Sequence, residues 1–275
     1  MFSLFKLVIA SSLILMSDRK DFWAPDDLSD STSELANGQV SSVSFDDLRG
    51  KRILLLVHGY NSTTDGALDH YQTIQKSLDP YDLYDTMIGY FWPGCDEGLE
   101  YYAAEKNTKK LAPRMQSYLE TLSKTAASLD VMAHSMGNRL ILEALELSSA
   151  PSPIVRNFYS LAAAVKDKDI EVGHPFYQAA LQAKNLLIFH SDRDDVLKYD
   201  FLLAEHAEAL GYEGLDKTSK EPKNIQFIDC TQFVDGHSGY FKAAPLYVFL
   251  KNQQAGQIVS SINVTLLPSG LATPK

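Results

Sequence analysis

The chain has 275 residues, 45% of them hydrophobic and 22% charged, an ordinary globular composition with enough length to bury one sizeable core. Its 35 acidic and 25 basic side chains give a formal net charge of -10. This charge argues against nucleic acid or an anionic lipid surface as a partner, because both bind basic protein faces. The two cysteines, Cys95 and Cys230, are too few for a disulfide scaffold and lack the spacing of a zinc site. We therefore expect two plain thiols, buried or half-buried, and no metal.

The first sixteen residues are apolar apart from Lys6 and three serines. This run is about two residues short of a membrane-spanning helix, and no clean small-residue cleavage site follows it. Two interpretations of residues 1–16 stay open: a signal peptide or membrane-associated segment, and a segment that lies on the surface or docks on the core. We expect a cytoplasmic protein, with export or membrane association through residues 1–16 as the alternative.

Three regions are expected along the chain. Residues 1–50 are predicted to be an irregular N-terminal lead-in, because residues 21–50 are rich in Asp and Ser and show no sustained period apart from a possible short strand over 40–45. Residues 51–255 are predicted to form one folded domain, and residues 256–275 a short C-terminal tail.

From residue 51 onward, short apolar runs alternate with amphipathic stretches, a pattern typical of strands and helices around a parallel sheet. Most of the apolar runs are continuous, as in strands that are buried on both faces. The predicted fold class is therefore α/β, with a doubly wound, mostly parallel sheet flanked by helices. The expected strands are residues 53–57, 87–91, 129–133, 158–162, 186–189 and 225–228.

Apolar residues recur at helical spacing in three stretches between these strands. They predict helices over residues 68–78, over residues 111–122 and directly after Ser135. Pro113 interrupts the second stretch, so that helix either begins near Ala112 or kinks at the proline.

The sequence AHSMG at residues 133–137 lies between a predicted strand and a predicted helix. A serine at such a turn has a strained backbone, which small residues two positions before and two positions after it permit. Ala133 and Gly137 meet this need, although Gly is the usual residue at the first position. The turn also places Ser135 at a helix N-terminus, where amides and the helix dipole favour a developing negative charge. This pattern predicts that Ser135 is a catalytic nucleophile.

The sequence HGYN at residues 58–61 directly follows the first strongly apolar strand. Next to a nucleophile turn of this kind, the loop after an earlier strand supplies one backbone N–H of an oxyanion hole, and the residue after the nucleophile supplies the other. We assign these two donors to the backbone amides of Tyr60 and Met136. For the His58 side chain, a structural role is the favoured interpretation.

Three aspartates, Asp192, Asp194 and Asp195, follow the strand predicted at residues 186–189. Asp192 lies in the tight part of the turn and Asp195 is expected to begin a helix, and aspartates at such places often act only as turn or N-cap residues. Asp194 lies where the loop turns into the apolar pair that follows it. We therefore assign Asp194 as the acid that orients a catalytic imidazole.

His237 is the histidine expected to act as the base. It is one of seven histidines, and it lies in the sequence DGHSGY, in a loop after the last predicted strand and downstream of the acid. The order Ser135, Asp194, His237 is the chain order of a triad built on a nucleophile elbow. His134, next to the nucleophile, is interpreted as structural.

From about Lys51 to Leu250 the chain resembles the α/β-hydrolase superfamily. In particular, it is similar to a bacterial, DUF900-like branch of uncharacterised hydrolases marked by HGFN or HGYN, by AHSMGN and by a late GHS. Here these motifs are HGYN at residues 58–61, AHSMGN at residues 133–138 and GHS at residues 236–238. Ala at the first position of the elbow is a departure from the usual Gly, which a single methyl group makes tolerable.

The resemblance implies a hydrolase without a cofactor and carries the catalytic roles onto Ser135, Asp194 and His237, but it implies no particular substrate. We expect hydrolysis of a small-molecule carboxylic ester through an acyl-enzyme intermediate. The alternatives are an acyltransferase or a thioesterase with the same triad, and a non-catalytic binding protein that keeps the fold.

The connection at residues 163–185 is too short for a large lid, so an open pocket that favours small soluble esters is expected. Residues 197–221 form the segment most able to act as a partial cap. Trp92 follows the carboxyl end of a predicted strand, where loops face the active site in doubly wound sheets. It either lines the pocket or packs as a structural residue.

Overall fold

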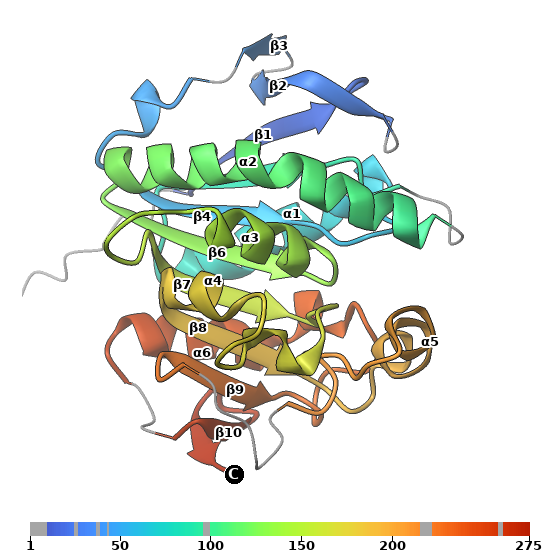
Figure 1. The fold of residues 1–275 in the computed structure, drawn as a ribbon. Helices are drawn as coiled ribbons and strands as arrows, with labels where there is room; N and C mark the ends of the chain where they lie inside the picture. The colour runs from blue at the N-terminus through green and yellow to red at the C-terminus, as the bar shows by residue number, and fades with distance from the viewer. Residues whose placement is uncertain are drawn as a thin grey trace, which may run out of the picture.

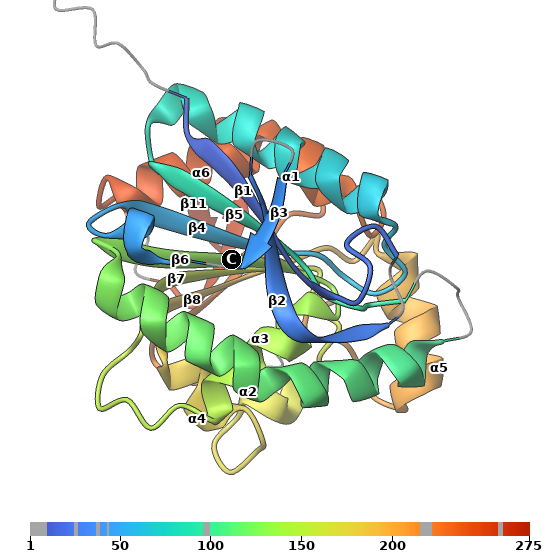
Figure 2. The same cartoon turned by 90° about the horizontal axis from the view of Figure 1, so that it is seen from above.

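A single mostly parallel sheet organises the chain. Within the residues that the structure describes, it has 11 strands in the order β11-β10-β9-β8-β7-β6-β4-β5-β1-β2-β3, and helices cover both of its faces (Figures 1 and 2). The predicted α/β fold class, a doubly wound sheet flanked by helices, is therefore confirmed. The computed structural model describes residues 10–24, 27–36, 39–42, 44–95, 100–214, 222–257 and 261–275.

The strands expected from the continuous apolar runs are all present and occupy the middle of the sheet, from β9 to β5. They pair in parallel, and their side chains are almost entirely buried, because helices cover both faces. The strands are β1 (Ser12–Arg19), β2 (Leu28–Ala36), β3 (Gln39–Ser42), β4 (Arg52–Val57), β5 (Thr86–Phe91), β6 (Ser128–His134), β7 (Val155–Leu161), β8 (Ala183–His190), β9 (Ile225–Asp229), β10 (Asn263–Leu266) and β11 (Ala272–Pro274).

Two hydrophobic cores hold the helices on the sheet. Side chains of α2, α3 and α4 pack in one core, and those of α1 and α6 pack in the other, which places these two groups on opposite faces (Figure 2). Among the described residues, no helix is both long enough and apolar enough to cross a bilayer. The helices are α1 (Thr64–Leu78), α2 (Tyr101–Thr125), α3 (Gly137–Glu146), α4 (Tyr177–Leu181), α5 (Leu202–Glu205) and α6 (Ala244–Gln254).

The helix that contains Pro113 is longer than its apolar pattern suggests. It begins at Tyr101, so the alternative start near Ala112 is wrong, and the proline lies inside the helix. A proline there removes one helical hydrogen bond. Leu111, Met115 and Leu119 are nevertheless fully buried against the sheet, and this tertiary packing stabilises the helix across the break.

The expectation that residues 1–50 form an irregular lead-in is wrong for the part of that segment which the structure describes. β1 is an inner strand, paired in parallel with β5, and β2 and β3 extend the same sheet as antiparallel strands. The possible short strand over residues 40–45 corresponds to β3. Residues 12–16 of the apolar start belong to β1, whereas residues 1–9 lie outside the described residues.

Buried charges explain why β1 is hard to recognise in the sequence. Its apolar run continues directly into Asp18 and Arg19, which look like the start of a solvated segment but are 0% and 2% exposed. Asp18 accepts a hydrogen bond from Arg114 of α2 at 2.8 Å. Arg19 donates to the carbonyl oxygen of Trp92 at 3.0 Å. Distant segments therefore supply the partners that make this burial possible.

The expected C-terminal tail at residues 256–275 is also part of the sheet. β10 pairs in parallel with β9, and β11 pairs antiparallel with β10. Val264 and Leu266 of β10 are fully buried, so the described end of the chain covers apolar surface at one edge of the sheet.

The carboxyl ends of the central strands carry the loops that form the site. The connection at residues 163–185 holds only a short 3-10 turn and α4, so no large lid is inserted there. After β8, the chain forms a π-helical turn, η4 (Val196–Phe201), that runs directly into α5. We call Val196–Glu205 the cap segment; it corresponds to the first part of the expected partial cap at residues 197–221, of which residues 215–221 lie outside the described residues.

Candidate active site

Ser135 lies in a sharp turn between β6 and α3. Its φ is +54°, a left-handed backbone conformation that costs about 1–3 kcal/mol for a residue other than glycine and that concentrates at functional sites. Two glycines allow the turn. A Cβ atom on Gly137 would lie 2.5 Å from the carbonyl oxygen of His58, and one on Gly59 would lie 2.7 Å from the Cβ atom of Ser135. The HG of the HGYN motif and the SxG of the AHSMGN motif therefore lie in close contact, and both contacts require glycine.

Backbone hydrogen bonds hold this turn in place. The Ser135 amide donates to the carbonyl oxygen of Leu161 at 3.0 Å. The Ser135 carbonyl oxygen accepts from the Asn138 side chain at 3.0 Å and from the amide of Ala164 at 3.3 Å. Asn138, the last residue of the AHSMGN motif, is fully buried. Its side chain satisfies the carbonyl group of Ser135, and this hydrogen bond fixes the strained backbone of the serine.

The structure brings His237 and Asp194 together from two loops. The Nδ1 atom of His237 lies 2.8 Å from the Oδ2 atom of Asp194. Asp194 is fully buried, and its Oδ1 atom accepts from the Leu197 amide at 3.0 Å. Both carboxylate oxygens are therefore engaged, and the carboxylate orients the ring. Asp192 and Asp195 are exposed, and Asp195 precedes the first residue of η4, as expected.

The predicted site residues meet at one cavity of about 690 Å³. Ser135, His237, Tyr60 and Met136 all line it, with Asp194 buried behind His237. This volume is in the range typical of small-molecule sites. Within the described ranges, no three His, Cys, Asp or Glu side chains gather as a metal site would require.

His58 and Trp92 are structural residues behind this cavity. Trp92 is fully buried, its indole N–H donates to the His58 carbonyl oxygen at 2.8 Å, and the two rings stack. Burial, and next the nearby guanidinium of Arg19, hold the pKa of His58 well below its ordinary value, so the ring is neutral. The structural alternative for Trp92 is therefore the correct one. Cys95 and Cys230 are both buried, as predicted.

His134, next to the nucleophile, contacts the loop of the expected base. Its Nε2–H donates to the carbonyl oxygen of His237 at 2.8 Å, and the two rings lie 4.7 Å apart. Burial holds the pKa of His134 well below its ordinary value, so the ring stays neutral and keeps a fixed donor. The only signal in the sequence is its place next to Ser135, which does not reveal this contact.

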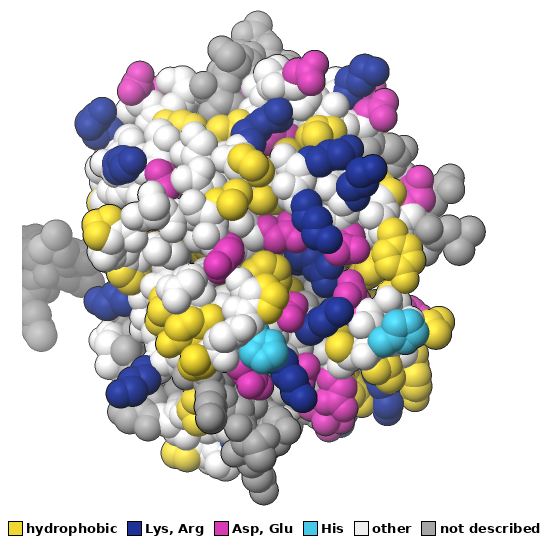
Figure 3. Space-filling view, in the orientation of Figure 1, with side chains coloured by type: hydrophobic (Ala, Val, Ile, Leu, Met, Phe, Trp, Pro, Cys, Tyr) yellow, Lys and Arg dark blue, Asp and Glu magenta, His cyan; other side chains and the backbone are white. Residues whose placement is uncertain are grey.

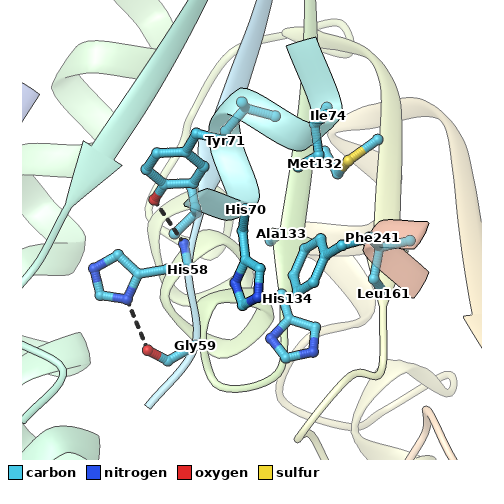
Figure 4. A pocket seen from close by; sticks show the side chains of 12 residues that line it. His58, Gly59, His70, Tyr71, Ile74, Met132, Ala133, His134, Leu161 and Phe241 are labelled. Atoms are coloured by element: carbon cyan, nitrogen blue, oxygen red, sulfur yellow. Dashed lines mark hydrogen bonds between the residues drawn. The ribbon is translucent and has the colours of Figure 1, made fainter. Parts of the chain in front are cut away.

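Phe241 follows the loop of His237 in the chain and packs beneath it. Its ring stacks on His70 of α1 at 3.9 Å and lies 4.9 Å from the ring of His134. Figure 4 shows these rings together with His58 where they line a small void. The volume of this void is about 10 Å³. This volume is close to that needed for one water molecule. The residues beneath the His237 loop are therefore tightly packed.

We expect His134→Ala to lower kcat by roughly 10- to 100-fold with little change in KM. The reason is that a displaced His237 is no longer aligned with the reacting groups, whereas the residues that bind the substrate are unchanged. His134→Gln should recover much of the loss, since its amide can donate to the same carbonyl. Steady-state kinetics on a short activated ester measures both effects. A folded His134→Ala protein with wild-type kcat would show that His134 does not position the loop.

Glu143 on α3 is a source of pH-dependent stability. Burial raises its pKa to about 7, above the ordinary value of about 4.3 in the unfolded chain. The folded state therefore binds a proton that the unfolded state releases, and this contribution to stability is complete below about pH 4 and lost as the pH rises through about 7.

Glu143→Gln should consequently unfold with a free energy about 2 kcal/mol larger than the wild type at pH 8, because the wild type must then bury a carboxylate. At pH 4 the two proteins should be equally stable. Urea unfolding at both pH values measures this difference. Glu208→Gln, the same change at an exposed position, serves as the control and should show no such dependence.

A doubly wound sheet with a strained serine, an aspartate-bound histidine and a cavity at its carboxyl edge defines the class of α/β hydrolases. Residues 36–253 match the family described as "Alpha/beta hydrolase of unknown function (DUF900)". The match spans most of the chain, and the chain belongs to this family.

The solved structures that are similar to the chain include an esterase and another hydrolase. An esterase called PE8 is 17% identical with a TM-score of 0.42, over 74% of this chain and 93% of that chain. A 2,6-dihydroxy-pseudo-oxynicotine hydrolase is 12% identical with a TM-score of 0.39, over 82% of this chain and 65% of that chain. No curated protein matches the sequence significantly.

Proposed function

We propose that this α/β hydrolase is a serine hydrolase that cleaves a carboxylic ester with Ser135 as nucleophile, His237 as base and Asp194 as the acid that orients it. The observation that carries the proposal is the 2.8 Å contact between His237 and a fully buried Asp194 at the cavity lined by the strained Ser135. Their side-chain chemistry and their order in the chain are those of a nucleophilic triad, which supports the proposal.

The reaction begins when the Ser135 hydroxyl attacks the ester carbonyl carbon while the Nε2 atom of His237 accepts the hydroxyl proton. Asp194 keeps the Nδ1 atom protonated and stabilises the imidazolium that forms. The tetrahedral intermediate then expels the alcohol, which leaves with the proton from His237, and an acyl-enzyme remains. Water, deprotonated by His237, attacks the acyl carbon and releases the acid and Ser135.

The oxyanion of the tetrahedral intermediate is assigned to the backbone amides of Tyr60 and Met136. Both residues line the cavity. Met136 is the N-cap residue of α3, so the positive end of the helix dipole also faces this charge. A preorganised donor of this kind contributes about 3 kcal/mol of transition-state stabilisation.

A fluorophosphonate probe tests the proposal directly, because it forms a covalent adduct only with an activated serine. We expect stoichiometric labelling of the wild type, an adduct mapped to Ser135 by peptide mass analysis, and no labelling of Ser135→Ala. A wild-type protein that resists the probe would instead support a binding protein that keeps the fold. Labelling without hydrolysis of any simple ester would favour transfer of the acyl group to an acceptor other than water.

A further inference from the structure

Two groups of residues that differ in chemistry line the cavity at Ser135, and we call them its apolar side and its polar side. The apolar side consists of apolar and aromatic side chains, mostly from the cap segment and the start of α2. The polar side consists of the loop after β4, the first turns of α1 and Ser238, and it presents hydroxyl, amide and imidazole groups. An ester has two parts joined at its carbonyl group, and a cavity lined in this way favours a substrate whose two parts differ in polarity.

The apolar side is anchored to the body of the protein. Glu205, at the end of the cap segment, pairs with Arg139 at 2.8 Å and with Lys166 at 3.2 Å. Its carboxylate also accepts a hydrogen bond from Tyr101 at 2.9 Å, and Tyr102 donates to the carbonyl oxygen of Ala204 at 3.1 Å. Arg139 lies in the first turn after the nucleophile elbow and is buried. The cap segment is therefore tied to α2, to α3 and to the loop after β7.

Several apolar side chains of this side reach the protein surface. Leu203, Tyr102 and Val196 line the cavity but are 76%, 64% and 41% exposed. Figure 3 shows hydrophobic side chains around α5 and the start of α2, on the right of that view. An apolar chain that leaves the cavity along the cap segment would cover them, and this burial favours binding in proportion to the area removed from water.

The polar side carries no positive charge that would attract an anion. It includes Asn61, Ser62, Thr63 and His70, and burial lowers the pKa of His70, so its ring is neutral. Among the described residues that line the cavity as a whole there is no lysine or arginine, and Asp200 of the cap segment adds a negative charge. Phosphate or carboxylate groups would enter this site without a partner.

We propose that the substrate joins an apolar acyl chain of medium length, held by the cap segment, to a neutral polyhydroxyl alcohol, held by the side formed by residues 61–70. Monoacylglycerols and acylated sugars share this chemistry. The inference rests on the proposed serine esterase function. It revises the expectation of small soluble esters, because the anchored cap segment supplies a binding surface for a longer chain.

Two substrates that differ only in charge test the alcohol side: 1-octanoylglycerol and 1-octanoylglycerol 3-phosphate, each below its micelle threshold. We expect kcat/KM for the neutral ester to be at least about tenfold higher. Asp200→Asn should narrow this preference, because it removes the negative charge at the cavity. Equal rates, or faster cleavage of the phosphate ester, would overturn the proposal.

The acyl side is tested by the ratio of kcat/KM for p-nitrophenyl octanoate to that for p-nitrophenyl acetate. We expect a ratio of about ten or more in the wild type, and a clear fall in Leu203→Ser, because a hydrophobic contact discriminates between chains by about this factor. Leu181→Ser, at an exposed leucine of α4 outside the cavity, is the matched control and should keep the wild-type ratio. A ratio near one in the wild type would overturn the acyl assignment.

The same experiments separate this inference from the proposed function. If the probe labels Ser135 and the acetate ester is cleaved while neither preference appears, only the substrate class is wrong. If Ser135 is not labelled and no ester is cleaved, the serine hydrolase function fails and the substrate class fails with it.

Discussion

Ser135→Ala is expected to lower kcat/KM for a short activated ester by at least about 10³-fold, while the protein stays folded. The change removes only the hydroxyl oxygen. The hydrogen bonds that hold the turn come from the backbone of residue 135 and from Asn138, and alanine retains that backbone. Residual activity should come only from binding and from the oxyanion donors, since these persist without the nucleophile.

Circular dichroism and thermal unfolding must show a folded variant before this loss is interpreted. Ser117→Ala, the same substitution at an exposed position on α2, is the control and should retain wild-type kinetics. A folded Ser135→Ala protein that keeps more than a few per cent of the activity would remove Ser135 from the role of nucleophile.

Asp194→Asn is expected to lower kcat by about 10⁴-fold, whereas Asp192→Asn and Asp195→Asn should stay near wild-type activity. Of the three aspartates, only Asp194 contacts the imidazole of His237, with its Oδ2 atom 2.8 Å from the Nδ1 atom. An amide at this position can still accept from Leu197 through its oxygen, so the loop keeps one of its contacts. It cannot stabilise an imidazolium, and it favours the wrong tautomer of His237.

The three single variants, measured with the same ester, distinguish this role from a general effect of charge in the loop. Each removes one negative charge, but two of them do so at exposed side chains. The assignment of Asp194 would be wrong if Asp192→Asn were the variant that loses activity. Labelling by the fluorophosphonate probe should slow in Asp194→Asn as well, because reaction with the probe also needs an activated serine.

The pattern of residues along the chain was enough to predict the central part of the sheet. Strands that are buried on both faces have continuous apolar runs in their sequences. The strands from β4 to β9 were therefore predictable. The elbow was predictable because its strain demands small residues two positions before and after Ser135, and Ala133 and Gly137 meet this demand. Chain order and the position of each loop after a strand were enough to select Asp194 and His237 as candidates.

The strands near the two ends of the chain could not be predicted, because they depend on tertiary contacts. A serine-containing apolar run followed by charges resembles a leader segment, yet residues 12–19 form an inner strand. The partners that permit this, Arg114 for Asp18 and Trp92 for Arg19, lie more than 70 residues away in the chain. Local propensity contains no information about such partners, and a buried charge is stable only where they exist.

The same reason applies around the active site. His134 reads as a neighbour of the nucleophile, but its contact with the loop of His237 spans 103 positions in the chain. In the sequence, Arg139 looks like an ordinary charged residue of a helix. In the structure it anchors the cap segment through Glu205, 66 positions away. Residue types and local spacing could therefore predict which groups are candidates for the chemistry, whereas the walls and supports that surround them depend on contacts that form only when the chain folds.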